Sequence, residues 1–567
     1  MSEILDELFK DDPFLQIKGS TYLLTPQDKE KLLRLGSFYD KKTRKIQLSR
    51  LHVGALEQLE DIVDQSKLDE SWKKAIHAIQ SFTSLKEAPL PKIFNAQLRP
   101  YQQEGVNWLS FLKEFQFGGI LADDMGLGKT IQALSILAHS HENPKINNPS
   151  LIVAPTSVIY NWKEEIQRFT PNLNTYLYIG KERIFPKDKS TQVIITSYAL
   201  LWRERELFTK HRFHYVILDE AHYIKNHKSQ TAKTAYQLSA DYRLSLTGTP
   251  LENNLTELWS QCSFINPGLF SNLENFKETF VTPIEKYQNM EAKERLRYLI
   301  KPFLLRRLKQ NVIKELPPKI EQTLWCEMSS KQRTLYNAIK QYYQAKLLKI
   351  VNQKGIKKSQ IEILEALLRL RQICCHPDLL QLENRKSYSF LPSSLRNIHE
   401  SIKLESVIEL IQTAVAEKHK VLLFSQFVSM LEILRSELDK AKIPYLILTG
   451  KTQNRQEIIK QFQNESTHSV FLLSLKAGGT GINLTAADYV IHYDPWWNPA
   501  VEVQATDRTH RIGQTKSVSV YKILIKDSIE EKIQALQEKK KGLIEDIIGG
   551  ISHGKGLTKE DLAYLFE

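Results

Sequence analysis

Short runs of hydrophobic, mostly β-branched residues recur along the chain, each followed by a turn signal and a stretch with helical spacing. In order they are SLIVAPT, TQVIITSY, HYVILDE and YRLSLTGT in the first half, and KVLLFSQF, PYLILTG, SVFLLSL, DYVIHYD and VSVYKILI in the second. The runs are continuous rather than alternating, which is typical of strands buried on both faces of a parallel sheet. Two separate blocks of strand–helix alternation therefore predict an α/β protein with two doubly wound parallel-sheet lobes.

The regions outside these blocks predict smaller units. Residues 265–400 read as mainly helical with no strand series, and a polar loop is expected at 352–360. The first 90 residues predict a strand and a capped helix in STYLLTPQDKEKLLRLG, and a linker follows at 87–94. ELPPK (315–319) indicates a connection between the lobes. We therefore expect four parts: an N-terminal accessory region (1–90), a first lobe (91–310), a second lobe (311–545) with a helical protrusion at about 325–400, and a tail (546–567).

The composition is that of a soluble globular protein, with 42% hydrophobic and 25% charged residues among 567. No hydrophobic run approaches the roughly 18 residues that a membrane-spanning helix needs. The acidic start, MSEILDELFKDD, lacks the pattern of a secretory signal. We therefore expect a cytoplasmic protein with no membrane association.

Four cysteines are too few for a disulfide scaffold. Cys374, Cys375 and His376 adjoin one another, but a zinc site needs four ligands at workable spacing, and no C-x-x-C partner exists. The pattern favours a small buried cysteine pair on a helix over a metal site.

The chain carries a formal net charge of +13, which is compatible with a polyanionic partner. Two segments concentrate this charge: residues 301–319 and residues 346–371 each carry a net +5. Either segment can face nucleic acid, or it can simply be a solvated surface of a basic protein.

The segment LADDMGLGKT (121–130) lies between the strand-like GGILA and the helical KTIQALSILA. This context would direct backbone N–H groups and a helix N-terminus at phosphates. Lys129 would lie along the β- and γ-phosphates, and the Thr130 hydroxyl would bind Mg²⁺. The generic loop has glycine where this chain has Asp123, so the match alone is also compatible with an ordinary strand–turn–helix corner.

Two further motifs follow strands of the first block. LDEAH ends a buried run, and phosphoryl transfer to water needs a carboxylate for Mg²⁺ and a residue that positions the water. Asp219 fits the first role and Glu220 the second. In SLTGTPLENN (245–254), Thr247 and Thr249 either link nucleotide state to lobe movement or belong to a Gly-Thr-Pro turn.

The second lobe contributes VQATDRTHRIGQT (503–515), in which Arg508 and Arg511 are three positions apart. On a helix this spacing places both guanidinium groups on one face, where they can neutralise a transferring phosphate. Such arginines typically contribute about 10³–10⁵ in rate. Because they belong to the other lobe, lobe closure would control hydrolysis. The alternative is a solvated helix face.

Taken together, these motifs resemble the Swi/Snf-type ATPases of helicase superfamily 2, particularly the compact bacterial branch. The resemblance covers roughly residues 90–545. An acidic residue at the position of Asp123 is usual in that family. The remaining matching segments are, in order, LRPYQQEGVNWL (98–109), IVAPTSVIYNW (152–162), ITSYALL (195–201), FLLRRLKQNV (303–312), VLLFSQF (421–427) and SLKAGGTGINLTAADYVIHYDPWWNP (474–499).

The resemblance implies two RecA-like lobes with ATP in the cleft and double-stranded DNA across both lobes. It implies a catalytic set of Lys129, Asp219, Glu220, Gln504, Arg508 and Arg511, with Mg²⁺ on Thr130 and Asp219. The implied nucleotide contacts are Arg99, Gln102 (on the base), Asp123, Asp124, Met125, Gly126, Leu127, Gly128, Lys129, Thr130, Gly479 and Gly481.

The implied nucleic-acid contacts come from both lobes. They are Pro155, Thr156, Asn161, Trp162, Ser197, Tyr198, Asn253, Ser425, Gln426, Lys476, Thr480, Trp496 and Asn498. Either Trp496 or Trp497 would press on the nucleic acid, although core packing explains these indoles equally well.

We therefore expect a DNA-dependent ATPase, a nucleoid-associated monomer, that tracks along duplex DNA and displaces or remodels bound proteins. RNA polymerase and other DNA-bound proteins are candidate partners. A strand-separating DNA or RNA helicase and a non-hydrolysing regulatory module remain alternatives. The sequence leaves open the target, the role of residues 1–90, and whether the chain is a short form or a fragment.

Overall fold

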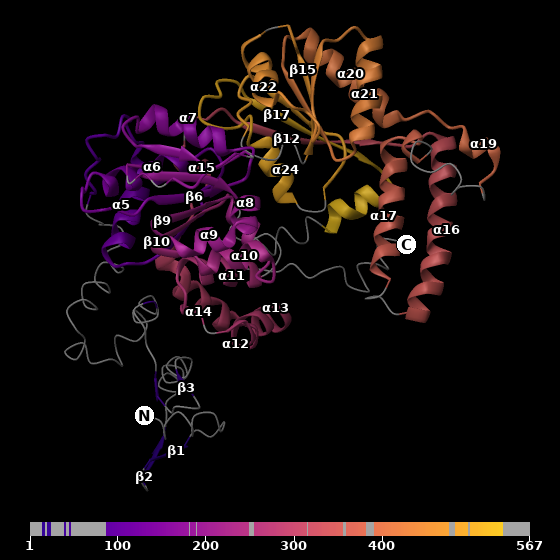
Figure 1. The fold of residues 1–567 in the computed structure, drawn as a ribbon. Helices are drawn as coiled ribbons and strands as arrows, with labels where there is room; N and C mark the ends of the chain where they lie inside the picture. Colours follow the sequence, from indigo (N-terminus) through magenta and orange to yellow (C-terminus); the bar gives the residue numbers. More distant parts are fainter. Residues whose placement is uncertain are drawn as a thin grey trace.

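The computed structural model describes residues 87–536 with short gaps, together with Leu51 and four short strands nearer the N-terminus. The gaps are residues 181, 187, 189, 249–254, 271, 314–315, 355–358, 381–390, 466, 476–481 and 497–498. Two lobes, each built on a parallel sheet, lie side by side (Figure 1). The predicted α/β fold with two parallel-sheet lobes is confirmed.

The first lobe contains a seven-stranded sheet in which every neighbouring pair is parallel. In spatial order the strands are β11 (Leu304–Leu305), β5 (Gly119–Leu121), β10 (Ser239–Leu246), β9 (Arg212–Asp219), β6 (Ser150–Ala154), β8 (Val193–Ser197) and β7 (Thr175–Leu177). Every residue of β5, β6 and β8 is buried, as the continuous hydrophobic runs predict.

Helices cover both faces of this sheet and close its hydrophobic core. They are α5 (Pro100–Glu114), α6 (Lys129–His141), α7 (Ile159–Phe169), α8 (Tyr198–Arg203), α9 (Arg205–Lys210), α10 (Gln230–Gln237) and α11 (Leu255–Ile265). Below them in Figure 1 lie α12 (Leu273–Phe276), α13 (Thr282–Tyr287) and α14 (Met290–Ile300). The Trp108 indole of α5 donates a hydrogen bond to the Pro302 carbonyl at 3.0 Å, which joins α5 to the segment between α14 and β11.

The strand order brings three loops of the first lobe together. β5, β10 and β9 are direct neighbours, so their carboxyl ends meet at one edge of the sheet. The segments that follow them contain LADDMGLGKT, SLTGT and LDEAH respectively. Ligands of open parallel sheets bind at this kind of edge, and the fold therefore assembles the predicted nucleotide motifs in one place.

The second lobe contains a six-stranded sheet that is also parallel throughout. In spatial order the strands are β12 (Lys319–Cys326), β17 (Val518–Ile525), β16 (Tyr489–His492), β13 (Val421–Ser425), β15 (Val470–Ser474) and β14 (Tyr445–Leu448). Alternate residues of β13 enter two different hydrophobic cores, Leu423 in one and Leu422 in the other. Both faces of this sheet are therefore covered.

The helices of the second lobe include a long hairpin. α16 (Ser330–Lys354) and α17 (Gln360–Cys375) project together away from the sheet (Figure 1). The other helices are α19 (Ser393–Arg396), α20 (Ile402–Ala416), α21 (Val428–Lys440), α22 (Arg455–Asn464) and α24 (Pro499–Thr506). Cys374 and Cys375 are buried at the end of α17, as the buried-pair interpretation predicts.

The described part of residues 265–400 is mainly helical, as expected, but two isolated strands that the sequence did not indicate lie within it. β11 has only two residues, and β12 has seven exposed residues out of eight. Neither strand therefore produces a buried hydrophobic run that the sequence could reveal. Between them, α15 (Lys309–Val312) lies in the connection from the first lobe to the second. The expected boundary at residues 310 and 311 falls inside this connection.

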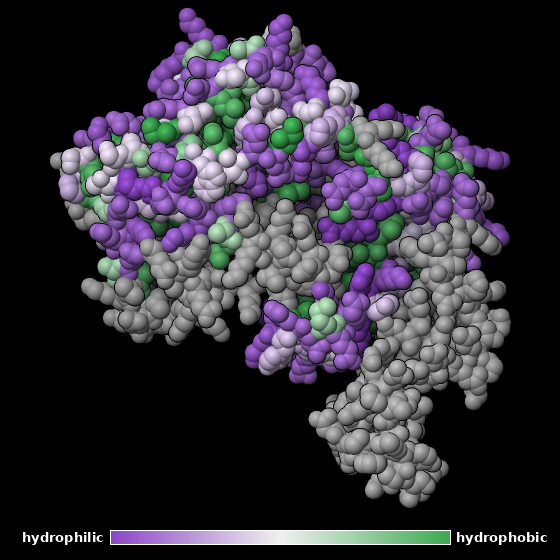
Figure 2. Space-filling model, turned by 180° about the vertical axis from the view of Figure 1, so that it is seen from behind, coloured by the Kyte–Doolittle hydropathy of each residue, from purple (hydrophilic) through white to green (hydrophobic). Residues whose placement is uncertain are grey.

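Near the N-terminus, β1 (Phe14–Ile17) pairs antiparallel with β2 (Ser20–Leu23), and β3 (Tyr39–Asp40) pairs antiparallel with β4 (Lys45–Ile46). β2 confirms the strand expected in STYLL, while the capped helix and the middle of the 352–360 loop lie outside the described residues. Within the described part of the chain, no helix has the length and hydrophobicity required to cross a membrane. The face shown in Figure 2 is largely hydrophilic, with hydrophobic residues scattered over it.

Candidate functional site

The loop between β5 and α6 has the shape of a phosphate-binding loop. Gly126 and Gly128 have φ values of 84° and 81°, a left-handed conformation that favours glycine. A Cβ on Gly128 would lie 2.5 Å from Gln102 Nε2, so a side chain there would also collide with its neighbours. α6 begins directly afterwards at Lys129, and no side chain caps its N-terminus, the kind of helix end that suits an anion.

Asp123, the residue that departs from the generic loop, is bound by an arginine of the same lobe. Its side chain is fully buried, and Arg307 donates to its carboxylate at 2.5 Å from Nη2 and at 2.9 Å from Nε. The Arg307 backbone N–H adds a third hydrogen bond at 3.1 Å. The carboxylate thus fixes the loop to the segment after β11, while the Asp123 backbone carbonyl accepts from Lys129.

Lys129 and Met125 are held close to the end of β10. Lys129 Nζ donates to the Asp123 carbonyl at 2.6 Å and to the Asp124 carbonyl at 3.3 Å. A Cβ on Gly248, which follows β10, would lie 2.8 Å from Met125 Cγ and 3.9 Å from Lys129 Nζ. The SLTGT motif therefore closes one side of the loop. Thr247 is buried in this motif, and Thr249 lies outside the described residues.

Asp219 stands at the end of β9, where two aromatic residues fix it. Trp162 Nε1 donates to Asp219 Oδ2 at 2.8 Å, and the Tyr198 hydroxyl donates to the Asp219 backbone carbonyl at 2.8 Å. Burial and, secondly, the adjacent Glu220 carboxylate raise the pKa of Asp219 to about 6. A divalent cation would offset this unfavourable burial of charge, so the carboxylate suits the predicted metal role.

Glu220 adopts a left-handed backbone conformation with φ 51°, which is uncommon for a residue with a side chain. Its carboxylate lies 3.4 Å from His222 Nδ1. Burial opposes ionisation of Glu220, but His222, Lys129 and Arg508 outweigh it and hold the pKa below its usual value. Glu220 is therefore an ionised group beside the phosphate loop, suited to orienting a water molecule.

The second lobe reaches this site through residues 507–511, which we call the arginine segment. Arg508 Nη2 lies 3.9 Å from Met125 Sδ, and a Cβ on Gly126 would lie 2.8 Å from Arg511 Cβ. Burial lowers the pKa of Arg508 to about 10, with Glu220 opposing that change most strongly. Both arginines remain cationic at neutral pH and lie against the phosphate loop.

The helical premise for these arginines was wrong. α24 ends at Thr506, so Arg508 and Arg511 lie in the turns that follow it. They converge on the first lobe because the chain folds back after the helix, with hydrogen bonds from Arg508 N to Ala505 O and from Arg511 N to Thr509 O. Gln504, half-buried, lies in the last turn of α24.

The residues expected at the base lie beside the loop. Gln102 Nε2 donates to the Leu127 carbonyl at 3.1 Å, and Gln102 Oε1 accepts from Arg99 N at 3.0 Å. Gln102 is buried, and its amide supports the phosphate loop directly. Its contact with a base, like that of Arg99, stays a prediction.

Several residues assigned to nucleic acid have other partners. Trp162 and Tyr198 hold Asp219, Ser197 caps α8 at Leu200 N, and Ser425 donates to Asp494 at 2.5 Å. All four side chains are buried, as is Pro155, and their contact with nucleic acid stays a prediction. Thr156 is exposed, and Asn161, Gln426 and Trp496 are half-buried. Asn253, Lys476, Gly479, Thr480, Gly481, Trp497 and Asn498 lie outside the described residues.

The basic segment 301–319 is also used internally. Arg307 binds Asp123, and Lys309 Nζ lies 2.6 Å from Asp507 Oδ1 of the arginine segment. Neither of the two interpretations that the sequence left open, a nucleic-acid face or a solvated face, describes these two residues. Sequence reasoning missed both, because their acidic partners lie 184 and 198 positions away in the chain.

The described donors fit Mg²⁺. The Thr130 hydroxyl belongs to the first turn of α6, and the half-buried Asp219 is the last residue of β9, whose carboxyl end lies at the same edge of the sheet. Oxygen ligands of this kind are those that Mg²⁺ prefers, together with phosphate oxygens and water.

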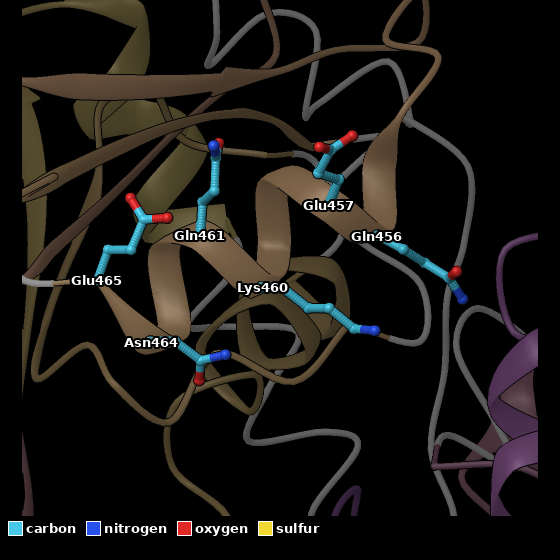
Figure 3. Close-up of a pocket in the computed structure, with 6 residues that line it drawn as sticks. All are labelled: Gln456, Glu457, Lys460, Gln461, Asn464 and Glu465. Atoms are coloured by element: carbon cyan, nitrogen blue, oxygen red, sulfur yellow. The ribbon is translucent and has the colours of Figure 1, made fainter.

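A separate hollow lies on α22, well outside this constellation. Figure 3 shows that its lining comes from Gln456, Glu457, Lys460, Gln461, Asn464 and Glu465. All six belong to one helix and its end, and none is a predicted site residue. This hollow is therefore not part of the candidate site.

Comparisons with known proteins agree with this site. Residues 101–379 match the family model of the SNF2-related domain, and residues 402–513 match that of the helicase conserved C-terminal domain. The putative ATP-dependent helicase/translocase YwqA of Bacillus subtilis is 38% identical over 530 residues, which cover 90% of this chain and 56% of that protein. A probable chromatin-remodeling complex ATPase chain of Oryza sativa is 39% identical over 485 residues, 83% of this chain and 43% of that protein.

A solved structure, the Sulfolobus solfataricus SWI2/SNF2 ATPase core in complex with dsDNA, is 36% identical and covers 85% of this chain and 99% of that chain, with a TM-score of 0.42. The chain spans about half the length of the curated relatives it matches. The two family matches together cover most of the chain, including the phosphate loop, LDEAH and the arginine segment up to Arg511. The chain therefore belongs to the SNF2-related family, among the ATPases of helicase superfamily 2.

Proposed function

We propose that this chain hydrolyses ATP with Mg²⁺ to move along double-stranded DNA, and that it displaces or remodels proteins bound there. The observation that carries the proposal is the division of one site between two lobes. The phosphate loop and Glu220 belong to the first lobe, and the arginine in contact with Met125, Arg508, belongs to the second. Hydrolysis then depends on how the lobes are arranged, as a motor requires.

Each described group has a distinct task in this proposal. The loop N–H groups and Lys129 hold the phosphates, Glu220 orients the attacking water, and the two arginines neutralise charge on the transferring phosphate. Mg²⁺, held by Thr130 and Asp219, would supply charge neutralisation at the phosphate oxygens. Because Glu220 and the arginines come from different lobes, neither half alone completes the catalytic set.

Duplex DNA is the proposed track. The net charge of +13 favours a polyanionic partner, and YwqA carries the name helicase/translocase. The Oryza relative is named as an ATPase of a chromatin-remodeling complex, which supports the displacement of DNA-bound proteins. RNA polymerase and other DNA-bound proteins are candidate targets, and we propose a monomer in the cytoplasm at the nucleoid.

The decisive experiment measures ATP turnover of the full chain with duplex DNA, single-stranded DNA and RNA at equal nucleotide concentration. We expect duplex DNA to stimulate most strongly and Lys129→Ala to abolish turnover. Displacement of a third strand from a triplex would report movement along the duplex. Affinity for DNA should fall by about 0.9 log units per log unit of salt for each neutralised phosphate.

The alternatives give different outcomes. Stimulation mainly by single strands or RNA, with separation of a forked duplex, would establish a strand-separating helicase instead. DNA binding without any turnover would establish a regulatory module.

A further inference from the structure

Lys309 connects the two lobes beside the nucleotide site. It begins α15, after the last strand of the first lobe, and its ammonium reaches the arginine segment of the second. Lys309 Nζ donates to Asp507 Oδ1 at 2.6 Å and to the His510 backbone carbonyl at 2.6 Å. Lys309 is 6% exposed, so this double contact is shielded from water. A buried ion pair is stable only when good geometry and further hydrogen bonds offset the loss of hydration.

The backbone of Lys309 is attached to the phosphate loop. Lys309 N donates to Asp124 Oδ2 at 3.0 Å, and Asp124 N donates to the Arg307 carbonyl at 3.0 Å. A Cβ on Gly126 would lie 3.7 Å from Lys309 Cε. The lysine stem therefore runs along the loop before its ammonium crosses to the other lobe.

The arginine segment is not held by the backbone hydrogen bonds of a helix, because α24 ends at Thr506, just before it. Contacts with other parts of the chain must therefore fix its position. Lys309 binds Asp507 on one side of Arg508 and the His510 carbonyl on the other, immediately before Arg511. The Asp507 carboxylate also acts electrostatically on both arginines. Lys309 pairs with that carboxylate where the arginine segment meets the phosphate loop, next to Met125 and Gly126.

We infer that Lys309 is a positioning residue for ATP hydrolysis, which holds the arginine segment against the phosphate loop so that Arg508 and Arg511 face the transferring phosphate. This inference rests on the proposed function. Lys309 acts through the arginines and does not need to touch the nucleotide. Its removal should therefore slow the chemical step without weakening the contacts that the first lobe makes with ATP. A displacement of about 1 Å in such groups can cost about 100-fold in rate.

The test compares four single variants of the full chain in duplex-stimulated turnover. We expect Lys309→Met to lower kcat about 100-fold while the KM for ATP stays within threefold. Lys309→Arg retains a cation with several donors and should recover at least a tenth of wild-type turnover. Asp507→Asn should lower kcat in the same direction. The matched control is Lys331→Met, since Lys331 forms an exposed ion pair with Glu400 within the second lobe.

A second readout follows the lobes directly. The four native cysteines are buried, so fluorescent labels can be attached to Lys233→Cys on α10 and Lys440→Cys on α21, both exposed positions. With Mg-ADP and beryllium fluoride, the wild type should show one short interlobe distance, and Lys309→Met should show a broader and longer distribution. This measurement does not depend on turnover.

Two results would overturn the inference. One is a kcat in Lys309→Met within threefold of the wild type, with the same interlobe distances. The other is a loss that appears only in the KM for ATP. If Lys309→Met does not fold, Asp507→Asn decides by the same criteria. A wild-type chain with no DNA-stimulated turnover would instead refute the proposed function, whatever the variants do.

Discussion

The buried pair between Asp123 and Arg307 makes the most demanding prediction about stability. Asp123 has no exposed side-chain surface and Arg307 has 10%. Replacement of Arg307 by methionine leaves a buried carboxylate with two weaker partners, Gln132 Nε2 at 3.3 Å and the backbone N–H of residue 307 at 3.1 Å. Removing one partner of a buried ion pair typically costs about 3–5 kcal/mol. We expect Arg307→Met to destabilise the first lobe by that amount.

The appropriate assay resolves the lobes, because a two-lobed chain need not unfold as one unit. Hydrogen exchange of peptides that contain β5 and β11 reports the free energy of opening in the first lobe. At about 2–4 °C per kcal/mol for a lobe of this size, the melting midpoint should fall by about 6–20 °C. Arg212→Met is the matched control, since Arg212 pairs with Asp241 at 2.7 Å but is 66% exposed. Its cost should stay below about 1 kcal/mol.

A double variant tests the cause of the loss. Asp123→Asn combined with Arg307→Met removes the unpaired charge, so it should recover at least half of the stability lost in the single variant. The reasoning is refuted if Arg307→Met costs no more than Arg212→Met, or if the double variant is the less stable of the two.

Three further predictions concern the site and the second lobe. Glu220→Gln should bind ATP with near wild-type affinity and hydrolyse it at least 100-fold more slowly in single turnover; rapid cleavage would contradict its role with water. Trp162→Phe removes the donor to Asp219 and should raise the Mg²⁺ concentration for half-maximal turnover by about 10–100-fold, whereas the control Trp108→Phe should not. Burial lowers the pKa of His492 from 6.5 to about 4, so the folded protein holds it neutral while the unfolded chain takes up a proton below pH 6.5. The contribution of His492 to the free energy of unfolding should therefore be fully present above pH 6.5. The free energy of unfolding should then decline by about 3 kcal/mol as the pH falls towards 4. Urea midpoints of His492→Gln should decline less over this range, and an equal decline would exclude His492 as the cause.

The fold was largely predictable because its strands are buried on both faces. Such strands appear as uninterrupted hydrophobic runs, and all nine runs correspond to strands of the two sheets. β12 was not predicted from the sequence because it is an exposed edge strand. Its hydrophobic residues, such as Ile320 and Trp325, remain accessible to water. Without burial on either face, neither of the two hydrophobic patterns used to recognise strands is produced.

The candidate site was predictable where a motif is local and unpredictable where it depends on distant partners. Gly126, Lys129, Asp219 and Glu220 lie in short segments whose residue order carries the chemistry. The hydrogen bond from Trp162 to Asp219 joins positions 57 apart, and nothing in the spacing of either residue indicates the other. The family resemblance predicts that Trp162 contacts nucleic acid, whereas in the structure its indole N–H donates to the Asp219 carboxylate.

The two adjacent acidic residues of the phosphate loop illustrate why these distant contacts matter. Asp123 binds Arg307, and Asp124 binds the backbone of Lys309, so both anchor on one segment. That segment leads from β11 of the first lobe to β12 of the second. Since it is fixed to the phosphate loop at one end and enters the other sheet at its far end, movement of the second lobe must act on the loop that holds the phosphates. Asp123, at the position of the generic glycine, and its neighbour Asp124 therefore connect this loop to the lobe junction through side-chain contacts that the generic glycine could not make.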